Sequence, residues 1–322
     1  MRRVFKLIGW LFLLLVVAAV TFIVVNRVPD RSVEELKARW AQSPSQFVEI
    51  AGMQVHLRDE GPREDSTPIV LLHGTSSSLH TWDGWVNALK DEHRVIRFDM
   101  PAFGLTGPSP DNNYTIENYS RIVVAVLDNL QIDHCVLAGN SLGGYVAWAT
   151  AVLHPGRVER LILIDASGYP YQAQSVPIGF KIARIPVLNR LMEKVLPRGI
   201  VESSVKNVYG NPSLVTPELI DRYFDLTTRA GNRQALVERF RQTQPGSLAK
   251  LVPELKLPTL ILWGGRDRLI PPDIGDRFHK EIVGSKLVRF NELGHVPQEE
   301  DPTRTVTALK EFLAQPRRAE AQ

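Results

Sequence analysis

The longest apolar segment in the chain is an uncharged run from Leu7 to Val25. As a helix it would rise about 28 Å at 1.5 Å per residue, close to the thickness of the hydrocarbon layer of a bilayer. The run has no polar face, which argues against a helix in a soluble core. Arg2, Arg3 and Lys6 precede it. We therefore predict a transmembrane anchor over residues 1–25.

A cleaved signal peptide is the second interpretation of this run. The apolar region of a signal peptide is usually shorter and is followed by a small-residue cleavage site, whereas Ala18 and Ala19 lie inside the run. Basic residues are denser before the run than after it, which favours a cytoplasmic N-terminus and places the rest of the chain outside the inner membrane. Residues 26–45 combine helical and charged character, and we interpret them as a connector.

From about Gln46 onward, short apolar runs alternate with helical patterns. Two runs joined at Ala51 and Gly52 predict a β-hairpin. Ile69–Leu72 is continuously apolar, as is typical of a strand buried on both faces. Further strands are predicted at residues 94–98, 134–138, 161–164, 259–263 and 286–290, with helices between most of them. This alternation predicts an α/β fold with a mostly parallel central sheet flanked by helices.

The alternation stops between residues 169 and 255, where helix-like segments are separated by prolines. A segment of this length is too long for a loop within a compact domain. We predict an inserted helical lid over residues 169–255. It divides the α/β domain into a first part at residues 46–168 and a second part at residues 256–315, followed by a tail at residues 316–322.

Composition narrows the functional classes. The chain has 322 residues, of which 44% are hydrophobic and 23% charged, as in ordinary globular proteins. Lys and Arg total 38 against 35 for Asp and Glu, and a net charge of +3 is too small to suggest a nucleic-acid partner. Cys135 is the single cysteine, so no intrachain disulfide can form, and we expect this side chain in the core.

The sharpest local motif is Gly139-Asn140-Ser141-Leu142-Gly143-Gly144, which lies between a predicted strand and a predicted helix. Flanking glycines permit a sharp strand-to-helix turn that exposes the Ser141 hydroxyl. The backbone N–H of Leu142, at the start of the helix, would then point to where an oxyanion forms. The alternative is a glycine-rich turn with an incidental serine.

A serine nucleophile needs a base, and the base needs a carboxylate that orients it. Of the eight histidines, His295 is the best candidate because it follows the last predicted strand. Asp267 lies in the turn after the preceding strand, where it is either the orienting acid or a solvated turn residue paired with a neighbouring arginine. Asp165, at the end of another strand, is the second candidate for the acid.

These motifs resemble those of the α/β-hydrolase superfamily over residues from about Gln46 to Leu313. The motifs are His73-Gly74-Thr75, Asp99-Met100-Pro101-Ala102-Phe103-Gly104, Gly139 to Gly144, and the segments around Asp267 and His295. The chain order of serine, aspartate and histidine matches that family. The resemblance implies an α/β-hydrolase fold and a second oxyanion N–H from Thr75, with Ser76 as the alternative. The family's common aromatic residue is absent at position 75.

The anchor and the lid together resemble those of membrane-anchored monoacylglycerol lipases and bacterial lipolytic esterases. It implies a serine hydrolase that acts on small-molecule or lipid esters through an acyl-enzyme, with no metal or organic cofactor. Apolar lid residues either line a substrate pocket or form the lid's own core: Val176, Ile178, Phe180, Ile182, Ile185, Val187, Leu188, Leu191 and Met192. Two alternatives are a carbon–carbon hydrolase of ring-cleavage diketones and an inactive binding protein. The sequence leaves the oligomeric state open.

Overall fold

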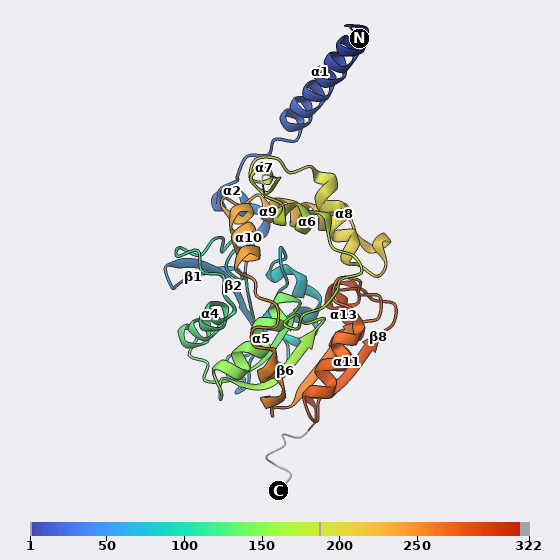
Figure 1. The fold of residues 1–322 in the computed structure, drawn as a ribbon. Coiled ribbons are helices and arrows are strands. Elements are labelled where there is room, and N and C mark those ends of the chain that lie inside the picture. The colour runs from blue at the N-terminus through green and yellow to red at the C-terminus, as the bar shows by residue number, and fades with distance from the viewer. Residues whose placement is uncertain (1, 187, 316–322) are drawn as a thin grey trace.

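The N-terminal helix projects from the body of the protein in the computed structural model, which describes residues 2–186 and 188–315 (Figure 1). This helix, α1 (Arg2–Val25), is apolar and long enough to cross a membrane, and none of its most apolar part is buried against the body. The structure therefore contains the predicted apolar helix. The predicted tail at residues 316–322 lies outside the described residues, as does Val187 of the predicted lid.

An 8-stranded sheet forms the centre of the body, in the order β1-β2-β4-β3-β5-β6-β7-β8. β1 and β2 are the predicted hairpin, β2 is antiparallel to β4, and the remaining neighbours are parallel, so the predicted fold class is confirmed. β3 and β5 are buried along their whole length, as continuous apolar runs require. The strands are β1 (Gln46–Ile50), β2 (Met53–Glu60), β3 (Ile69–Leu72), β4 (Val95–Phe98), β5 (Cys135–Asn140), β6 (Val158–Ile164), β7 (Thr259–Gly264) and β8 (Lys286–Phe290).

Helices cover both faces of this sheet. One face packs against α4 (Ile116–Asn129), α5 (Leu142–Leu153) and α11 (Pro272–Glu281). The other face packs against α3 (Asp83–Leu89) and α13 (Pro302–Leu313). Cys135 lies in the first of these cores, where burial raises the pKa of its thiol to about 12. The thiol is therefore a packing group at neutral pH.

The segment between β6 and β7 folds into helices that sit above the sheet (Figure 1). We call residues 169–255 the cap. Its α-helices are α6 (Ile178–Arg184), α7 (Leu188–Met192), α8 (Arg198–Val208), α9 (Pro217–Thr227) and α10 (Asn232–Gln242), with 3₁₀ turns at Pro212–Leu214 and Ala249–Glu254. Thr216 caps α9 by accepting a hydrogen bond from the N–H of Leu219, and Pro217 fits the first turn.

The predicted connector is bonded to the cap. Val28 N–H donates to the carbonyl of Lys194, and the N–H of Arg31 donates to the carbonyl of Thr228. The buried Arg233 of α10 also bonds Asp30 and the Val28 carbonyl. α2 (Val33–Trp40) follows, with a capping box at its start. The helix α1 is thus fixed to the cap side of the protein.

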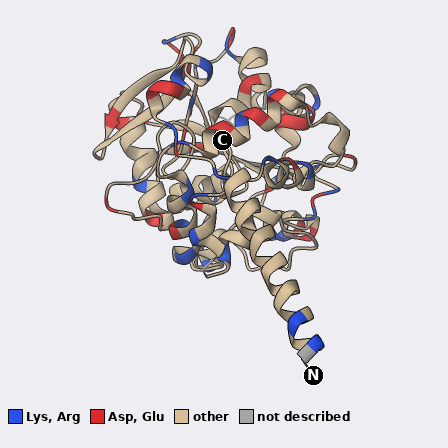
Figure 2. Cartoon of the chain, turned by 90° about the horizontal axis from the view of Figure 1, so that it is seen from above, with Lys and Arg blue, Asp and Glu red and all other residues tan. Residues whose placement is uncertain are grey.

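Charged residues are interspersed over the body (Figure 2). Viewed from above, lysine and arginine as well as aspartate and glutamate occur in several parts of the body. Many of them form ion pairs across elements, such as Arg39 of α2 with Asp221 of α9. This distribution agrees with the small net charge of +3.

Candidate active site

The predicted nucleophile turn joins β5 to α5, and Ser141 occupies its tip. Ser141 has φ 56° and ψ −115°, a conformation that is strained for a residue with a side chain. Its N–H donates to the Ile164 carbonyl of β6 at 3.0 Å, which fixes the turn against the neighbouring strand. A Cβ atom at Gly139 would overlap the Gly143 carbonyl, and one at Gly143 would overlap the Leu72 carbonyl. The tight turn therefore requires both glycines.

His295 and Asp267 form a buried pair at the ends of the last strands. His295 Nδ1 lies 2.7 Å from Asp267 Oδ2. The other oxygen, Asp267 Oδ1, accepts hydrogen bonds from the N–H groups of Leu269 and Ile270, at 2.8 and 3.0 Å. Among the described residues Asp267 forms no ion pair with an arginine, so its partner is the imidazole. His295 Nε2 is left for a second contact.

Asp165, the second candidate for the acid, lies behind this pair rather than in it. Its Oδ1 accepts a hydrogen bond from the N–H of Gly264 at 3.0 Å, and its Oδ2 is buried without a hydrogen-bond partner among the described residues. Burial and the nearby Asp267 carboxylate raise the pKa of Asp165 well above its usual value. The neutral form of Asp165 is therefore more favoured than that of an ordinary aspartate.

These three side chains also have the spacing of metal ligands. One ligand atom from each of Asp165, Asp267 and His295 lies within 4.8 Å of the others. Their proximity has a simpler explanation, because the His295 and Asp267 atoms are hydrogen-bonded to each other and Asp165 accepts a hydrogen bond from the N–H of Gly264. His295 and Asp267 thus stay the predicted base and its orienting acid, with Asp165 next to them.

The loop after β3 lies beside the nucleophile. A Cβ atom at Gly74 would lie 3.2 Å from Cβ of Ser141, so this backbone approaches Ser141 closely. Thr75 lines a cavity together with Ser141 and Leu142. Ser76, the predicted alternative to Thr75, has φ 60°. The two predicted oxyanion donors, Thr75 and Leu142, thus border the same space, and their role stays a prediction.

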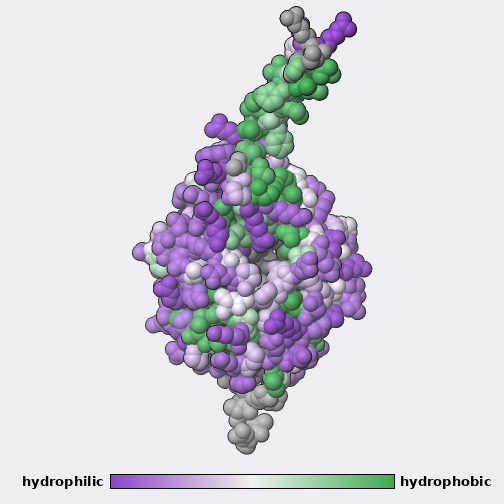
Figure 3. Space-filling view, in the orientation of Figure 1, coloured by the Kyte–Doolittle hydropathy of each residue, from purple (hydrophilic) through white to green (hydrophobic). Residues whose placement is uncertain are grey.

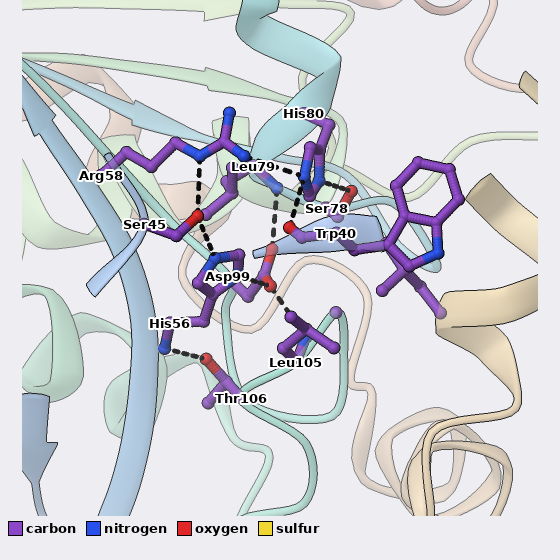
Figure 4. A network of polar contacts seen from close by, with 12 residues as sticks. Trp40, Ser45, His56, Arg58, Ser78, Leu79, His80, Asp99, Leu105 and Thr106 are labelled. Carbon is purple, nitrogen blue, oxygen red and sulfur yellow. Dashed lines mark hydrogen bonds and ion pairs between the residues drawn. The ribbon is translucent and has the colours of Figure 1, made fainter. Parts of the chain in front are cut away.

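A buried polar network holds this loop in place (Figure 4). Asp99 Oδ1 accepts from the N–H of Leu79 at 2.8 Å, while Oδ2 accepts from the N–H of Leu105 at 2.8 Å. His56 Nδ1 also contacts Asp99 Oδ2 at 2.7 Å. Burial alone would raise the pKa of Asp99, but the charge and hydrogen bond of His56 outweigh it and hold that pKa well below its usual range. The ionised Asp99 ties the loop after β3 to the loop after β4.

Sequence reasoning missed two contacts that position the site. Asn140 Nδ2 donates to the His295 carbonyl at 2.9 Å, which joins the nucleophile turn to the histidine loop. The N–H of His295 donates to the carbonyl of Val208 at 2.7 Å, so α8 of the cap also holds this loop. The position of Asn140 directly before Ser141 was the available signal. The sequence contains no signal that indicates the contact between His295 and Val208.

Two cavities meet at Ser141. The first, of about 100 Å³, also contains His295 and is otherwise lined mainly by apolar cap side chains such as Met192, Ile200 and Val205. The second, of about 520 Å³, contains Thr75 and Leu142 and runs beneath α6 and α10. Figure 3 shows a hollow in the face of the body below α1.

The apolar cap residues divide between these cavities and the surface. Phe180 and Met192 line the first cavity, and Val176 lines the second. In contrast, Ile178, Ile185 and Leu188 are exposed. The two predicted roles, pocket lining or lid core, therefore do not account for every member of the set.

Comparison with known proteins identifies the family of the fold. The model of the alpha/beta hydrolase fold family matches residues 67–302. A 2-hydroxy-6-oxo-2,4-heptadienoate hydrolase from Pseudomonas putida is 29% identical over 280 residues, which span 83% of this chain and 95% of the relative. A meta-cleavage product hydrolase from Pseudomonas fluorescens matches with TM-score 0.71 and 25% identity, over 87% of this chain and 98% of its own. A thermophilic esterase from Thermogutta terrifontis matches with TM-score 0.70 and 26% identity, over 83% of this chain and 98% of the esterase chain.

Proposed function

Because the chain belongs to the alpha/beta hydrolase family, we propose that it is a serine hydrolase of carboxylic esters. The observation that carries this proposal is the 2.7 Å contact between His295 and Asp267, with His295 and Ser141 lining one cavity. Serine, histidine and aspartate in this relation are the parts of an acyl-transfer site. The similarity to a solved esterase at 26% identity adds support.

In the proposed reaction, His295 Nε2 accepts the proton of Ser141 Oγ as the oxygen attacks the ester carbonyl carbon. The N–H groups of Leu142 and Thr75 stabilise the oxyanion of the tetrahedral intermediate. The intermediate collapses to an acyl-enzyme, and the leaving alcohol takes the proton from His295. Water, deprotonated by His295, then attacks the acyl carbon and releases the carboxylic acid and free Ser141. Asp267 stabilises the imidazolium in both halves.

The apolar cavity beside Ser141 favours esters whose acyl group is an apolar chain of several methylene groups. Met192, Ile200 and Val205 contribute its wall, and burial of each methylene group of a chain against such side chains is worth about 0.8 kcal/mol. Lipid or acylglycerol esters are therefore the substrate class that we propose. An enzyme attached to the bilayer meets such substrates at high local concentration.

We further propose that α1 anchors the protein in the inner membrane, with the body outside it. The connector is bonded to the cap at Val28 and Lys194, so the cap is the part of the body next to the anchor. Exposed apolar residues of the cap, namely Ile178, Ile185 and Leu188, lie on or between α6 and α7, the same elements that carry Lys181 and Arg190. An apolar surface with basic residues suits contact with anionic lipid headgroups.

An epitope tag at the N-terminus tests the anchor against a cleaved signal peptide. We expect the tag and the body to sediment together with membranes and to resist alkaline carbonate extraction, because an apolar helix remains in the bilayer. A reporter at the C-terminus is expected to report a location outside the inner membrane. Release of the body without its tag would instead favour the signal peptide.

A carbon–carbon hydrolase is the second candidate function. The observation that favours it is the 29% identity to a hydrolase of 2-hydroxy-6-oxo-2,4-heptadienoate across 95% of that relative. The same serine and histidine would then act on a ketone carbonyl. The apolar helix before the body is the feature that this function does not use.

Rates on p-nitrophenyl esters from acetate to decanoate, measured beside 2-hydroxy-6-oxo-2,4-heptadienoate, distinguish the two candidates. We expect kcat/KM to rise with acyl length and to exceed that on the dienoate at least about tenfold. Val201→Phe, which fills the apolar cavity, should lower the rate on long esters more than on acetate. Val283→Phe, at an exposed position, is the matched control. A faster reaction with the dienoate would favour the carbon–carbon hydrolase.

A further inference from the structure

Arg239 of α10 is a buried cation without an acidic partner. Four arginines are buried within the described residues, and three of them have partners: Arg97 binds Glu60, Arg233 binds Asp30, and Arg160 binds backbone carbonyls. The guanidinium group of Arg239 donates no hydrogen bond and forms no ion pair with any described residue, although only 8% of the residue is exposed. Burial of an unpaired charge costs several kcal/mol, so such a group calls for a ligand.

Arg239 borders the larger of the two cavities that meet at Ser141. This cavity of about 520 Å³ also contains Thr75 and Leu142, the predicted oxyanion donors. Arg184 lines it too, and none of its lining residues is acidic. On its other side Arg239 borders a cavity of about 290 Å³ that includes Glu117, but the described structure has no ion pair between the two. Arg239 therefore borders the space next to the nucleophile without an ion pair to any described acidic residue.

Two arginines of the cap converge on one aromatic ring in this cavity. The Cζ atom of Arg184 lies 4.7 Å from the centroid of the Phe240 ring, and that of Arg239 lies 5.2 Å from it. Burial lowers the pKa of Arg239, and the charge of Arg184 adds to this effect. An arginine nevertheless keeps its charge at neutral pH. Each guanidinium group provides several N–H donors for the oxygens of an anion in this cavity.

We propose that Arg239 and Arg184 form a subsite for an anionic group of the substrate, a carboxylate or a phosphate, in the cavity that shares Ser141 with the apolar one. This inference rests on the proposed ester hydrolysis and narrows its substrate. The preferred ester carries an apolar chain on one side of the scissile carbonyl and an anionic group on the other. Neutral triesters, which lack that anion, are then poor substrates.

The test compares p-nitrophenyl hexanoate with the p-nitrophenyl monoester of adipic acid, which has the same acyl length and a terminal carboxylate. With the full-length protein in detergent, Arg239→Gln should lower kcat/KM on the adipate ester about 10- to 100-fold more than on the hexanoate, mainly through KM. Arg239→Lys, which keeps the charge, should recover part of this loss. Arg241→Gln, at an exposed position of the same helix, is the matched control and should change neither rate.

A binding measurement separates this inference from the proposed function. We expect hexyl phosphate or hexanoate to raise the thermal unfolding temperature of the Ser141→Ala protein more than 1-hexanol does, and Arg239→Gln to remove the difference. Stabilisation by hexyl phosphate alone identifies a phosphate subsite, and stabilisation by hexanoate alone identifies a carboxylate subsite. Equal effects of all three compounds, or equal losses on both esters with Arg239→Gln, would overturn the subsite even if the esters are hydrolysed. A protein that hydrolyses no ester but shows the binding difference would instead overturn the ester proposal alone.

Discussion

Replacing Ser141 with alanine is expected to lower kcat for p-nitrophenyl butyrate by about 10⁴-fold or more. The substitution removes the only protein atom that forms a covalent bond with the substrate in the proposed mechanism. It leaves the backbone N–H groups of Thr75 and Leu142 beside the cavity, so the residual rate reports their contribution. Steady-state hydrolysis, together with labelling by a fluorophosphonate probe, measures the effect.

The backbone at Ser141 makes the choice of control variant important. Alanine adopts the strained φ of 56° about as poorly as serine does, so the fold and the turn should persist. Ser167→Ala removes a neighbouring hydroxyl that donates to the Ser141 carbonyl, and it should keep the probe labelling. Equal ester hydrolysis by the wild-type and Ser141→Ala proteins would exclude this serine as the nucleophile.

The fold was predictable because its determinants are local in the sequence. Continuous apolar runs at Ile69–Leu72 and Thr259–Gly264 give buried strands, and the alternation with helices requires parallel connections. The predicted positions of strand ends were less accurate than the predicted strands themselves. The strand predicted to end at Ala138 continues to Asn140. Glycine at position 139 weakens the strand pattern, whereas tertiary pairing with β6 extends the strand.

Much of the candidate site was also predictable, since Ser141, Asp267 and His295 each follow a strand at the same edge of a parallel sheet. The choice between Asp267 and Asp165 needed the structure. Both acids follow strands, and only the three-dimensional arrangement shows which carboxylate contacts His295. The lack of an acidic partner for Arg239 could not be predicted from the sequence either. It depends on which residues from distant segments of the chain line the cavity, and none of these is acidic.

The two buried carboxyl groups lead to the second large prediction. Asp267→Asn is expected to lower kcat by about 10³- to 10⁴-fold. An asparagine has no charge to stabilise the imidazolium of His295, and its amide favours the wrong imidazole tautomer. The hydrogen bonds from Leu269 and Ile270 to Oδ1 can remain, so the loss should appear in kcat with little change in the melting temperature.

Asp165→Asn is the matched control, because it makes the same chemical change beside the same pair. Burial and the Asp267 carboxylate raise the pKa of Asp165 and so favour its neutral form, and a neutral amide of the same shape should retain most of the activity. The unfolded chain releases that proton above about pH 3.9. The raised pKa therefore costs the wild-type protein stability as the pH rises above this value, and the cost grows until the folded pKa is reached. Asp165→Asn lacks this cost, so its melting temperature should match the wild type near pH 4 and exceed it at pH 7. A loss of activity as large as that of Asp267→Asn would mean instead that both acids act on His295 as ionised groups.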